Sequence, residues 1–347
     1  GMSACDLAEF VADPAPRFEQ TWSVPAPGTA LSVAELLPTS GDITILPDSS
    51  AFEMSITGAN ISERVGNDCA ACQALNGQNA PKPEFTLTAA SGSPLPADVA
   101  SATIVGGEIV VTLTNNMSFD PLRPNEAPGA TQGYLRLLIH SGSFVLGRDS
   151  IDGADTPWLP GTDLVMTIPF ATGTITTDIT VDVDMFSPQG DHNVPIDANG
   201  TMNAVADVQN LHVASVGLNV ASNPIASDPD TLDLADIDAA ITDNVVSGTL
   251  EMTITNPFAI TGTVDMRFAY GPGPGEVVTT SFPLPTGTAQ VVAVTLTQAE
   301  LNSLFGNEVA LDVTGAVSSS GPITVTPTMA ISLENRLVLV IRTGEAN

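Results

Sequence analysis

The sequence predicts an all-β protein built from tandem immunoglobulin-like β-sandwiches, and three observations lead to this fold class. Segments in which apolar and polar residues alternate recur along the chain, separated at short intervals by clusters of Pro, Gly and Asn. A nine-residue passage at residues 107–115 recurs in similar form at residues 248–256. Hydrophobic residues make up 43% of the 347 residues, which is enough to fill packed cores. Together these features indicate an internal duplication of a β-domain.

The duplication extends beyond the repeated passage. Gly133 begins a strand-like segment that runs to residue 139, and Gly262 begins the corresponding segment that runs to residue 268. A further alternating segment follows in each copy, at residues 160–168 and 286–294. The order and spacing of these segments therefore match over three strands.

We expect three regions along the chain. Residues 1–98 would form an N-terminal tether and an irregular β-rich region, residues 99–215 the first sandwich repeat, and residues 216–347 the second. The first repeat contains a Pro-rich insertion at residues 120–128 on a hairpin connection. Because such connections usually run over the surface, we expect a surface loop there.

Eleven segments show the alternation of β-strands, with one polar and one buried face. They cover residues 43–46, 109–114, 135–139, 164–168, 179–184, 211–220, 250–255, 264–268, 291–296, 309–314 and 333–341. Two other stretches predict helices. Residues 231–241 have apolar residues at helical spacing, and in residues 297–305 the pair Thr297 and Glu300 forms a capping box.

The net charge of −30 arises from a shortage of bases. Asp and Glu number 39, an ordinary share, whereas Lys and Arg number only nine and Lys82 is the only lysine. Nucleic acid is excluded as a partner, because phosphate binding requires clustered Lys or Arg. The same charge disfavours direct contact with anionic membrane surfaces.

The N-terminus resembles that of a bacterial lipoprotein. Ser3 and Ala4 precede Cys5 as small residues precede the acylated Cys of a lipobox, and a Pro-containing stretch at residues 13–16 suits a tether. We expect a lipid on Cys5 to be the only membrane contact, and an outer membrane lipoprotein in the bacterial cell envelope, facing the periplasm or the cell surface. The alternative is an ordinary free cysteine near a true start methionine. No apolar run approaches the roughly 20 residues of a membrane-spanning helix.

Cys69 and Cys72 are the sharpest local feature. A zinc site would need four ligands, and no second Cys pair accompanies them; a c-type haem would need His where Gln73 stands. The surrounding residues, rich in Asn and Gly, indicate a loop. We therefore predict a structural disulfide between Cys69 and Cys72, as suits an oxidising envelope compartment. Free thiols, or a metal or redox role, remain the alternatives.

Three carboxylates, those of Asp149, Asp152 and Asp155, surround Gly153 and form a candidate calcium site. The spacing fails the EF-hand pattern because Ile151 occupies a ligand position, and Asp is in any case a common turn residue. Calcium is the only cofactor that the sequence suggests. No nucleophile motif, phosphate loop or paired histidines occur, so we expect no enzyme.

The second repeat resembles a known family. Its Asn256-Pro257-Phe258 after a strand, Gly262 at the start of the next strand, and Pro285 and Gly287 before another are similar to the water-stress and hypersensitive-response domain of late-embryogenesis-abundant type 2 proteins. The resemblance covers residues 245–318 and implies a seven-stranded, immunoglobulin-like sandwich without catalytic residues. The first repeat keeps Asn115 but has Asn116 where the proline would stand.

Two functions follow as hypotheses. The leading one is a non-enzymatic lipoprotein of the bacterial cell envelope or surface, acting as a structural or adhesive β-sandwich module with a protein or glycan partner. The alternative is a module that binds carbohydrate or a small hydrophobic ligand. Its site would lie in loops at residues 120–129 and 270–275, with Trp158 as a stacking platform. A buried Trp158 is the competing interpretation.

Overall fold

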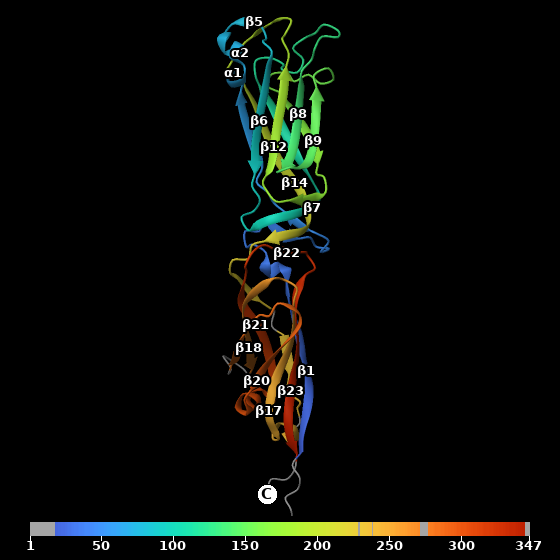
Figure 1. Ribbon diagram of the computed structural model, residues 1–347, viewed down its shortest axis with the longest axis vertical. Helices are drawn as coiled ribbons and strands as arrows, with labels where there is room; N and C mark the ends of the chain where they lie inside the picture. The colour runs from blue at the N-terminus through green and yellow to red at the C-terminus, as the bar shows by residue number, and fades with distance from the viewer. Residues whose placement is uncertain (1–17, 228–229, 238, 271–276, 344–347) are drawn as a thin grey trace, which may run out of the picture. The chain divides into compact units, whose positions relative to one another are not determined.

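The computed structural model describes residues 18–227, 230–237, 239–270 and 277–343 (Figure 1). Strands account for 61% of the structure and helices for 7%, which confirms the all-β class. The chain forms two compact units, and each is built on two main antiparallel sheets; unit 2 also contains a separate two-stranded sheet. Unit 1 holds the described residues of segments 1–35, 221–318 and 330–347, and unit 2 holds segments 36–220 and 319–329. In sequence, unit 2 is therefore an insertion within unit 1.

Unit 2 is a sandwich of two four-stranded layers with short additions. Its first sheet has the order β10 (Asp163–Pro169), β7 (Val99–Asn116), β14 (Thr201–Leu218) and β4 (Ala59–Arg64). Its second sheet has the order β6 (Phe85–Ser93), β12 (Ile179–Ser187), β8 (Tyr134–Ser141) and β9 (Phe144–Asp152). The additions are β2 (Ile43–Ile45), β3 (Phe52–Met54), β11 (Gly173–Ile175) and β22 (Ile323–Val325) on the first sheet, the pair β5 (Asn79–Pro81) and β13 (Asn193–Pro195), and helices α1 (Val65–Asp68) and α2 (Ala70–Ala74).

Unit 1 has the same arrangement. One sheet has the order β1 (Phe18–Ser32), β23 (Ala330–Thr343), β17 (Val245–Asn256) and β20 (Gly287–Leu296). The other begins with β15 (Asn223–Ala226) and β16 (Asp230–Asp233), followed by β21 (Glu308–Ser319), β18 (Ile260–Tyr270) and β19 (Val277–Pro283). Its helices are α3 (Ala239–Thr242) and α4 (Gln298–Leu304), and a 3-10 helix, η1 (Val33–Leu36), lies where the chain passes from unit 1 to unit 2.

The strand orders of the two units correspond one to one. The row β4–β14–β7–β10 of unit 2 matches β1–β23–β17–β20 of unit 1, and β6–β12–β8–β9 matches β15/β16–β21–β18–β19. This is the relation that a duplicated domain predicts. It also shows that the expected N-terminal region, residues 1–98, is not a separate domain. Residues 36–98 belong to unit 2, whereas β1 pairs with β23 at the other end of the chain.

A buried asparagine closes the corresponding strand in each unit. In unit 2 the Asn115 side chain donates to the backbone oxygens of Phe119 (3.0 Å) and Trp158 (2.7 Å), and its oxygen accepts from the Met117 amide (2.8 Å). In unit 1 the side chain of Asn256 makes the same three contacts. Its partners are the oxygens of Ile260 (3.2 Å) and Pro285 (3.0 Å) and the amide of Phe258 (3.1 Å). We call this set of three hydrogen bonds the asparagine clamp.

The residues around the clamp are equivalent as well. Met117 and Phe258, two positions after each asparagine, are both 3% exposed. Gly133 directly precedes β8, Gly262 is the third residue of β18, and both lie against the backbone of a neighbouring strand. A Cβ atom on Gly133 would lie 2.4 Å from the Phe186 oxygen, and one on Gly262 would lie 2.1 Å from the Ala316 oxygen. Only glycine permits these close approaches.

Several local expectations can be compared with the structure. All eleven strand segments coincide with or overlap strands, and α4 begins with the expected capping box of Thr297 and Glu300. The helix expected at residues 231–241 is wrong in its first half. Residues 230–233 form β16, which pairs with β21, and only residues 239–242 are helical. The edge of an existing sheet supplies hydrogen bonds there, and these outweigh the weak helical periodicity.

The insertion at residues 120–128 is only partly a surface loop. Its second half, residues 126–128, is exposed, but Pro121, Leu122, Pro124 and Asn125 are buried. Asp120 accepts from the amides of Leu122 and Arg123, and the amide group of Asn125 donates to two loop carbonyls. These bonds fold the first half of the insertion back onto the sandwich.

Replacing Asn115 with Ala should destabilise unit 2, because one buried amide and two buried carbonyl oxygens lose their partner. The expected loss is ~2–4 kcal/mol of unfolding free energy. The two tryptophans allow the unfolding of each unit to be followed separately, since Trp158 lies in unit 2 and Trp22 in unit 1. In a Trp22→Phe background, urea unfolding followed by Trp158 fluorescence reports unit 2 alone.

Asn116→Ala is the matched control, because Asn116 is the exposed neighbour of the clamp residue and its replacement should change the midpoint little. Asn256→Ala should produce the same loss in unit 1, followed by Trp22 in a Trp158→Phe background. Equal midpoints for Asn115→Ala and Asn116→Ala would show that the clamp does not stabilise the sandwich.

Candidate functional site

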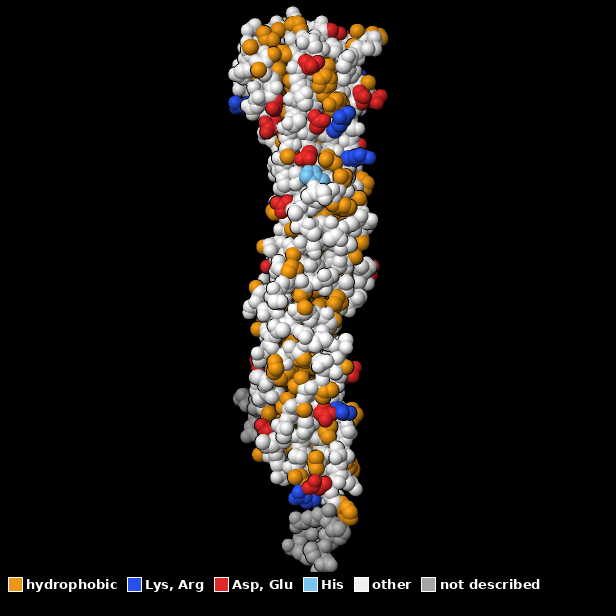
Figure 2. Space-filling view, viewed as in Figure 1, with side chains coloured by type: hydrophobic (Ala, Val, Ile, Leu, Met, Phe, Trp, Pro, Cys, Tyr) orange, Lys and Arg blue, Asp and Glu red, His pale blue; other side chains and the backbone are white. Residues whose placement is uncertain are grey.

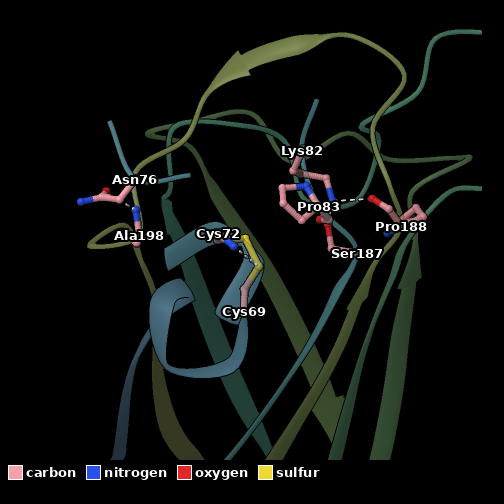
Figure 3. Close-up of a disulfide and its surroundings, with 8 residues drawn as sticks. All are labelled: Cys69, Cys72, Asn76, Lys82, Pro83, Ser187, Pro188 and Ala198. Atoms are coloured by element: carbon pink, nitrogen blue, oxygen red, sulfur yellow. Dashed lines mark hydrogen bonds between the residues drawn. A yellow bond between two sulfur atoms is a disulfide. The ribbon is translucent and has the colours of Figure 1, made fainter. Parts of the chain in front are cut away.

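The loops at one end of unit 2 contain a disulfide and, near it, a buried lysine (Figure 3). The structure joins Cys69 and Cys72 by a disulfide bond between α1 and the first turn of α2. The Cys72 amide also donates to the Cys69 sulfur at 3.0 Å. Both side chains are buried, at 2% and 0% exposure. The bond therefore closes one tight turn within the protein interior.

Residues 65–77, which contain the disulfide, are hydrogen-bonded to the loop between β13 and β14. The amides of Val65, Gly66 and Gly77 donate to the oxygens of Gly200, Ala198 and Ile196, respectively. In the opposite direction, the Ala198 amide donates to the side-chain oxygen of Asn76 at 2.9 Å. These contacts bind the helical turn along its whole length, so the disulfide has the surroundings of a structural staple.

Lys82, the only lysine of the chain, lies close by and is 1% exposed. Its ammonium group donates to the backbone oxygens of Pro83 (3.0 Å) and Pro188 and to the Ser187 hydroxyl (2.7 Å). Ser187 in turn donates to the Pro121 oxygen at 2.5 Å. An ammonium group has three donors, and all three have acceptors here.

Two aromatic rings complete the surroundings of Lys82. Its nitrogen lies 5.1 Å from the ring centre of Phe85 and 5.7 Å from that of Phe119. Both distances are within the range of cation–π attraction. Burial lowers the pKa of Lys82 from 10.5 to about 7, although the nearby carboxylates of Glu84 and Asp120 act in the opposite direction. Lys82 is therefore a buried amine that can titrate near neutral pH.

A small cavity of about 40 Å³ lies beside Lys82, and its lining includes Asp120, Arg123 and His192. Its polar groups are already engaged within the protein. Asp120 accepts from the amides of Leu122, Arg123 and Trp158, and the guanidinium of Arg123 donates to the oxygens of Gly153 and Ala154. The arrangement ties four loops together and leaves little room for a substrate. Sequence reasoning missed this cluster, and the one available signal was the single lysine.

The three aspartates of the candidate calcium site do not converge. Asp149 and Asp152 lie three residues apart on β9, so their side chains point to opposite faces of the sheet. The carboxylate of Asp152 accepts from the Ala154 amide in a turn, and Asp155 is exposed. The glycine at position 153 is required by packing and not by metal binding, because a Cβ atom there would lie 1.9 Å from the Leu122 oxygen. The expectation of a calcium site on Asp149, Asp152 and Asp155 is therefore not supported by their geometry.

Trp158 cannot be a stacking platform, because its side chain is 0% exposed. Its indole nitrogen donates to the Thr162 oxygen at 3.1 Å, and its backbone amide donates to Asp120 at 2.9 Å. Its own backbone oxygen accepts from Asn115. The expectation of an exposed Trp158 is therefore wrong, since the residue fills the core and forms part of the asparagine clamp.

The remaining candidates lie partly outside the described residues. Cys5 precedes residue 18 and is not among them, and of the loop at residues 270–275 only Tyr270 is described. Within the described ranges, no three His, Cys, Asp or Glu side chains come together as a metal site. The helices of these ranges include none with the length and apolar character that crossing a bilayer requires.

Comparison with known proteins finds distant structural similarities, among them the following three. No family model matches the sequence, and no curated protein matches it. A "putative secreted protein" from Parabacteroides distasonis ATCC 8503 aligns over 94% of this chain and 100% of its own, with 11% identity and a TM-score of 0.35. A chain of broad bean stain virus aligns over 78% of this chain and 91% of its own, with 13% identity and a TM-score of 0.18. A chain of infectious bursal disease virus Gx strain aligns over 96% of this chain and 73% of its own, with 13% identity and a TM-score of 0.20. The strand pairing within the chain defines its architecture.

The titration of Lys82 should make the stability of unit 2 depend on pH. Between about pH 7 and pH 10.5 the unfolded chain binds a proton on Lys82 that the folded chain has lost, so folding becomes more favourable as the pH rises. Below about pH 7 the cost of burying the charge is fully present and constant. The slope should approach ~1.4 kcal/mol per pH unit within that window.

The Lys82→Met variant isolates this contribution, since other titrating groups are common to both proteins. The unfolding free energy of the wild type minus that of Lys82→Met should be flat from pH 5.5 to 6.5 and should increase from pH 7.5 to 9.5. Urea unfolding monitored by Trp158 fluorescence measures it. A difference that stays flat up to pH 9.5 would mean that the three acceptor oxygens keep the ammonium charged, contrary to this account.

Proposed function

We propose that the protein is a non-enzymatic lipoprotein of the bacterial cell envelope, anchored through Cys5 and acting as a structural or adhesive β-sandwich module. One observation carries the proposal. The first and last described residues, Phe18 and Thr343, lie at the same end of unit 1, because they pair with each other at the ends of β1 and β23. A lipid near the N-terminus would thus hold the unit by one end.

The insertion of unit 2 starts from the opposite end of the same strand pair. Ser32, the last residue of β1, pairs with Ala330, the first residue of β23. The chain passes between the units at residues 35/36, 220/221, 318/319 and 329/330, so four covalent connections join them. A module of this topology would carry its second domain as an insertion in the chain of the anchored one.

In this proposal residues 6–17, which lie outside the described residues, connect the lipid on Cys5 to β1. Twelve residues can span at most about 40 Å when extended. A single acyl chain gives marginal membrane binding, and the two or three chains of a mature bacterial lipid anchor give stable attachment. The buried disulfide between Cys69 and Cys72 is compatible with an oxidising envelope compartment.

A non-enzymatic role is supported by the chemistry of the described residues. The buried polar side chains with the most unusual surroundings, Lys82, Asn115 and Asn256, all have hydrogen bonds within the fold. The cluster around Lys82 holds loops together and has no open cleft beside it. A structural or adhesive module needs only this kind of rigid scaffold.

Metabolic labelling tests the anchor. The gene is expressed in a bacterial host with all of the coding sequence that precedes Met2, and cells are grown with radioactive palmitate. The wild type should carry the label and sediment with the membranes, whereas Cys5→Ser should be unlabelled and remain in the supernatant after lysis. Cys69→Ser combined with Cys72→Ser is the control for a general effect of cysteine loss and should keep the label. An unlabelled wild type would overturn the proposal.

A further inference from the structure

The outward face of the sheet β6–β12–β8–β9 in unit 2 carries an unusual group of side chains. On β8 the residues Leu135, Leu137 and Ile139 are buried, so the alternate residues from Tyr134 to His140 point outward. Neighbouring strands add outward residues at matching positions. The pairs across the face are Tyr134 with Phe186 and Asp152, Arg136 with Asp184 and Ser150, Leu138 with Asp182 and Arg148, and His140 with Thr180.

This face carries basic side chains in a chain that has few of them. Figure 2 shows Lys or Arg side chains and a histidine near acidic ones in the part of unit 2 that contains β12, β8 and β9. Elsewhere, Arg267, Arg336 and Arg342 contact carboxylates at 3.1, 2.5 and 2.7 Å. Those three guanidinium groups are engaged within the protein.

Arg136 and Arg148 differ from these engaged arginines. The Arg136 side chain is 61% exposed and lies 3.9 Å from Asp184, beyond hydrogen-bonding distance. Arg148 is exposed and makes no ion pair within the described ranges. Both guanidinium groups therefore keep donors for a ligand.

The two arginines line one hollow. Its volume is about 490 Å³, and the rest of its lining consists of Leu137, Leu138, Asp149 and Ser150, so one carboxylate residue lies beside the two arginines. Volumes of ~300–1,000 Å³ are typical of sites for small ligands. Because Arg136 lies opposite Ser150 and Arg148 lies opposite Leu138, the arginines are diagonal neighbours on adjacent strands. Residues in such diagonal positions are ~7–8 Å apart. Side chains of this length can reach a single anion from such positions.

The neighbouring groups define the rest of the ligand. The Arg136 guanidinium lies 4.0 Å from the ring centre of Tyr134, and the Tyr134 ring lies 5.7 Å from that of Phe186, so two aromatic rings lie beside Arg136 on this face. Asp182 and Asp184 can accept hydrogen bonds from hydroxyl groups. The Nε2 of His140 donates to the Asp182 carboxylate at 3.1 Å and so orients one of these carboxylates.

We propose that this hollow binds an acidic sugar, a hexuronate residue, with its carboxylate on Arg136 and Arg148 and its ring hydroxyls facing Asp184. Arginine pairs with planar carboxylates through two parallel hydrogen bonds. A neutral sugar would leave both guanidinium groups without a partner. An acidic peptide would bring no hydroxyl groups to the aspartates. The inference deepens the proposed adhesive role by naming the glycan chemistry that the module would recognise, and it rests on that role for its biological meaning.

Calorimetric titration of the purified full-length chain tests the binding at 0.15 M salt, where charges more than ~8 Å apart are screened. The ligands are galacturonate, trigalacturonate and lactose, the last being a neutral sugar. The wild type should bind one or both acidic ligands and not lactose. A tighter trimer would identify a polysaccharide as the source of the uronate, and equal affinities would identify the single sugar acid.

Arg136→Gln and Arg148→Gln should each weaken acidic-sugar binding at least tenfold. Arg64→Gln is the matched control, because this substitution removes the same charge. Arg64 is an exposed arginine at the end of β4, on the other sheet of unit 2. Unchanged Trp158 fluorescence would show that each variant is folded.

Absence of binding to both acidic ligands, equal binding of lactose, or an equal loss in Arg64→Gln would overturn the assignment. The palmitate experiment does not depend on sugar binding. A labelled protein that binds no uronate would refute this site and leave the anchor proposal standing, and an unlabelled protein that binds uronate would do the reverse.

Discussion

A buried side-chain amide at the end of a strand is the constraint on which both units depend. Where β7 and β17 end, the chain must turn toward the next strand, and the turn leaves carbonyl oxygens and an amide inside the sandwich. Asn115 and Asn256 bind these groups with one amide each. No apolar side chain could do so, and unpaired polar groups in such a place cost ~1–3 kcal/mol each. The clamp also fixes the loop that leads to β10 or β20, since Trp158 and Pro285 supply the second acceptor.

The nested order of the units follows from the pairing of β1 with β23. These strands are about 300 positions apart in sequence, yet they lie side by side in one sheet. Closing so long a loop costs more conformational entropy than a local hairpin, although the cost grows only slowly with length. Within unit 2 the disulfide and the buried Lys82 fix loops that lie outside the regular strand pairing.

The sequence was sufficient for features that depend on local order. Period-two alternation predicts the positions of the strands because one face of each sheet must be buried, and the pair Thr297 and Glu300 predicts the start of α4 because the capping bonds lie within one turn. The resemblance of Asn115 to Asn256 marked an equivalent position, but the sequence did not show that their amides act as clamps. That function depends on partners such as Trp158, which lies 43 residues after Asn115.

Features that depend on distant partners were missed or misjudged. β1 was assigned to an N-terminal region because nothing in its sequence identifies β23 as its neighbour. The sequence leaves open whether Trp158 is exposed or buried, because burial cannot be deduced from its loop position. It groups Asp149, Asp152 and Asp155 because spacing alone does not show which face of a strand each side chain occupies. The pair Arg136 and Arg148 went unnoticed since they meet only through the register of β8 and β9.

The most direct test of the central claim is residue-resolved hydrogen exchange at the amides of Met117 and Phe258, measured by NMR on the intact protein. Each of these amides lies beyond the last residue of its strand and donates only to an asparagine side chain among the hydrogen bonds described here. If the clamp holds each sandwich, both amides should exchange as slowly as those in the centres of β7 and β17. Exchange of either amide at the rate of an exposed loop would contradict the account, because it would show that the asparagine bond opens while the sandwich remains folded.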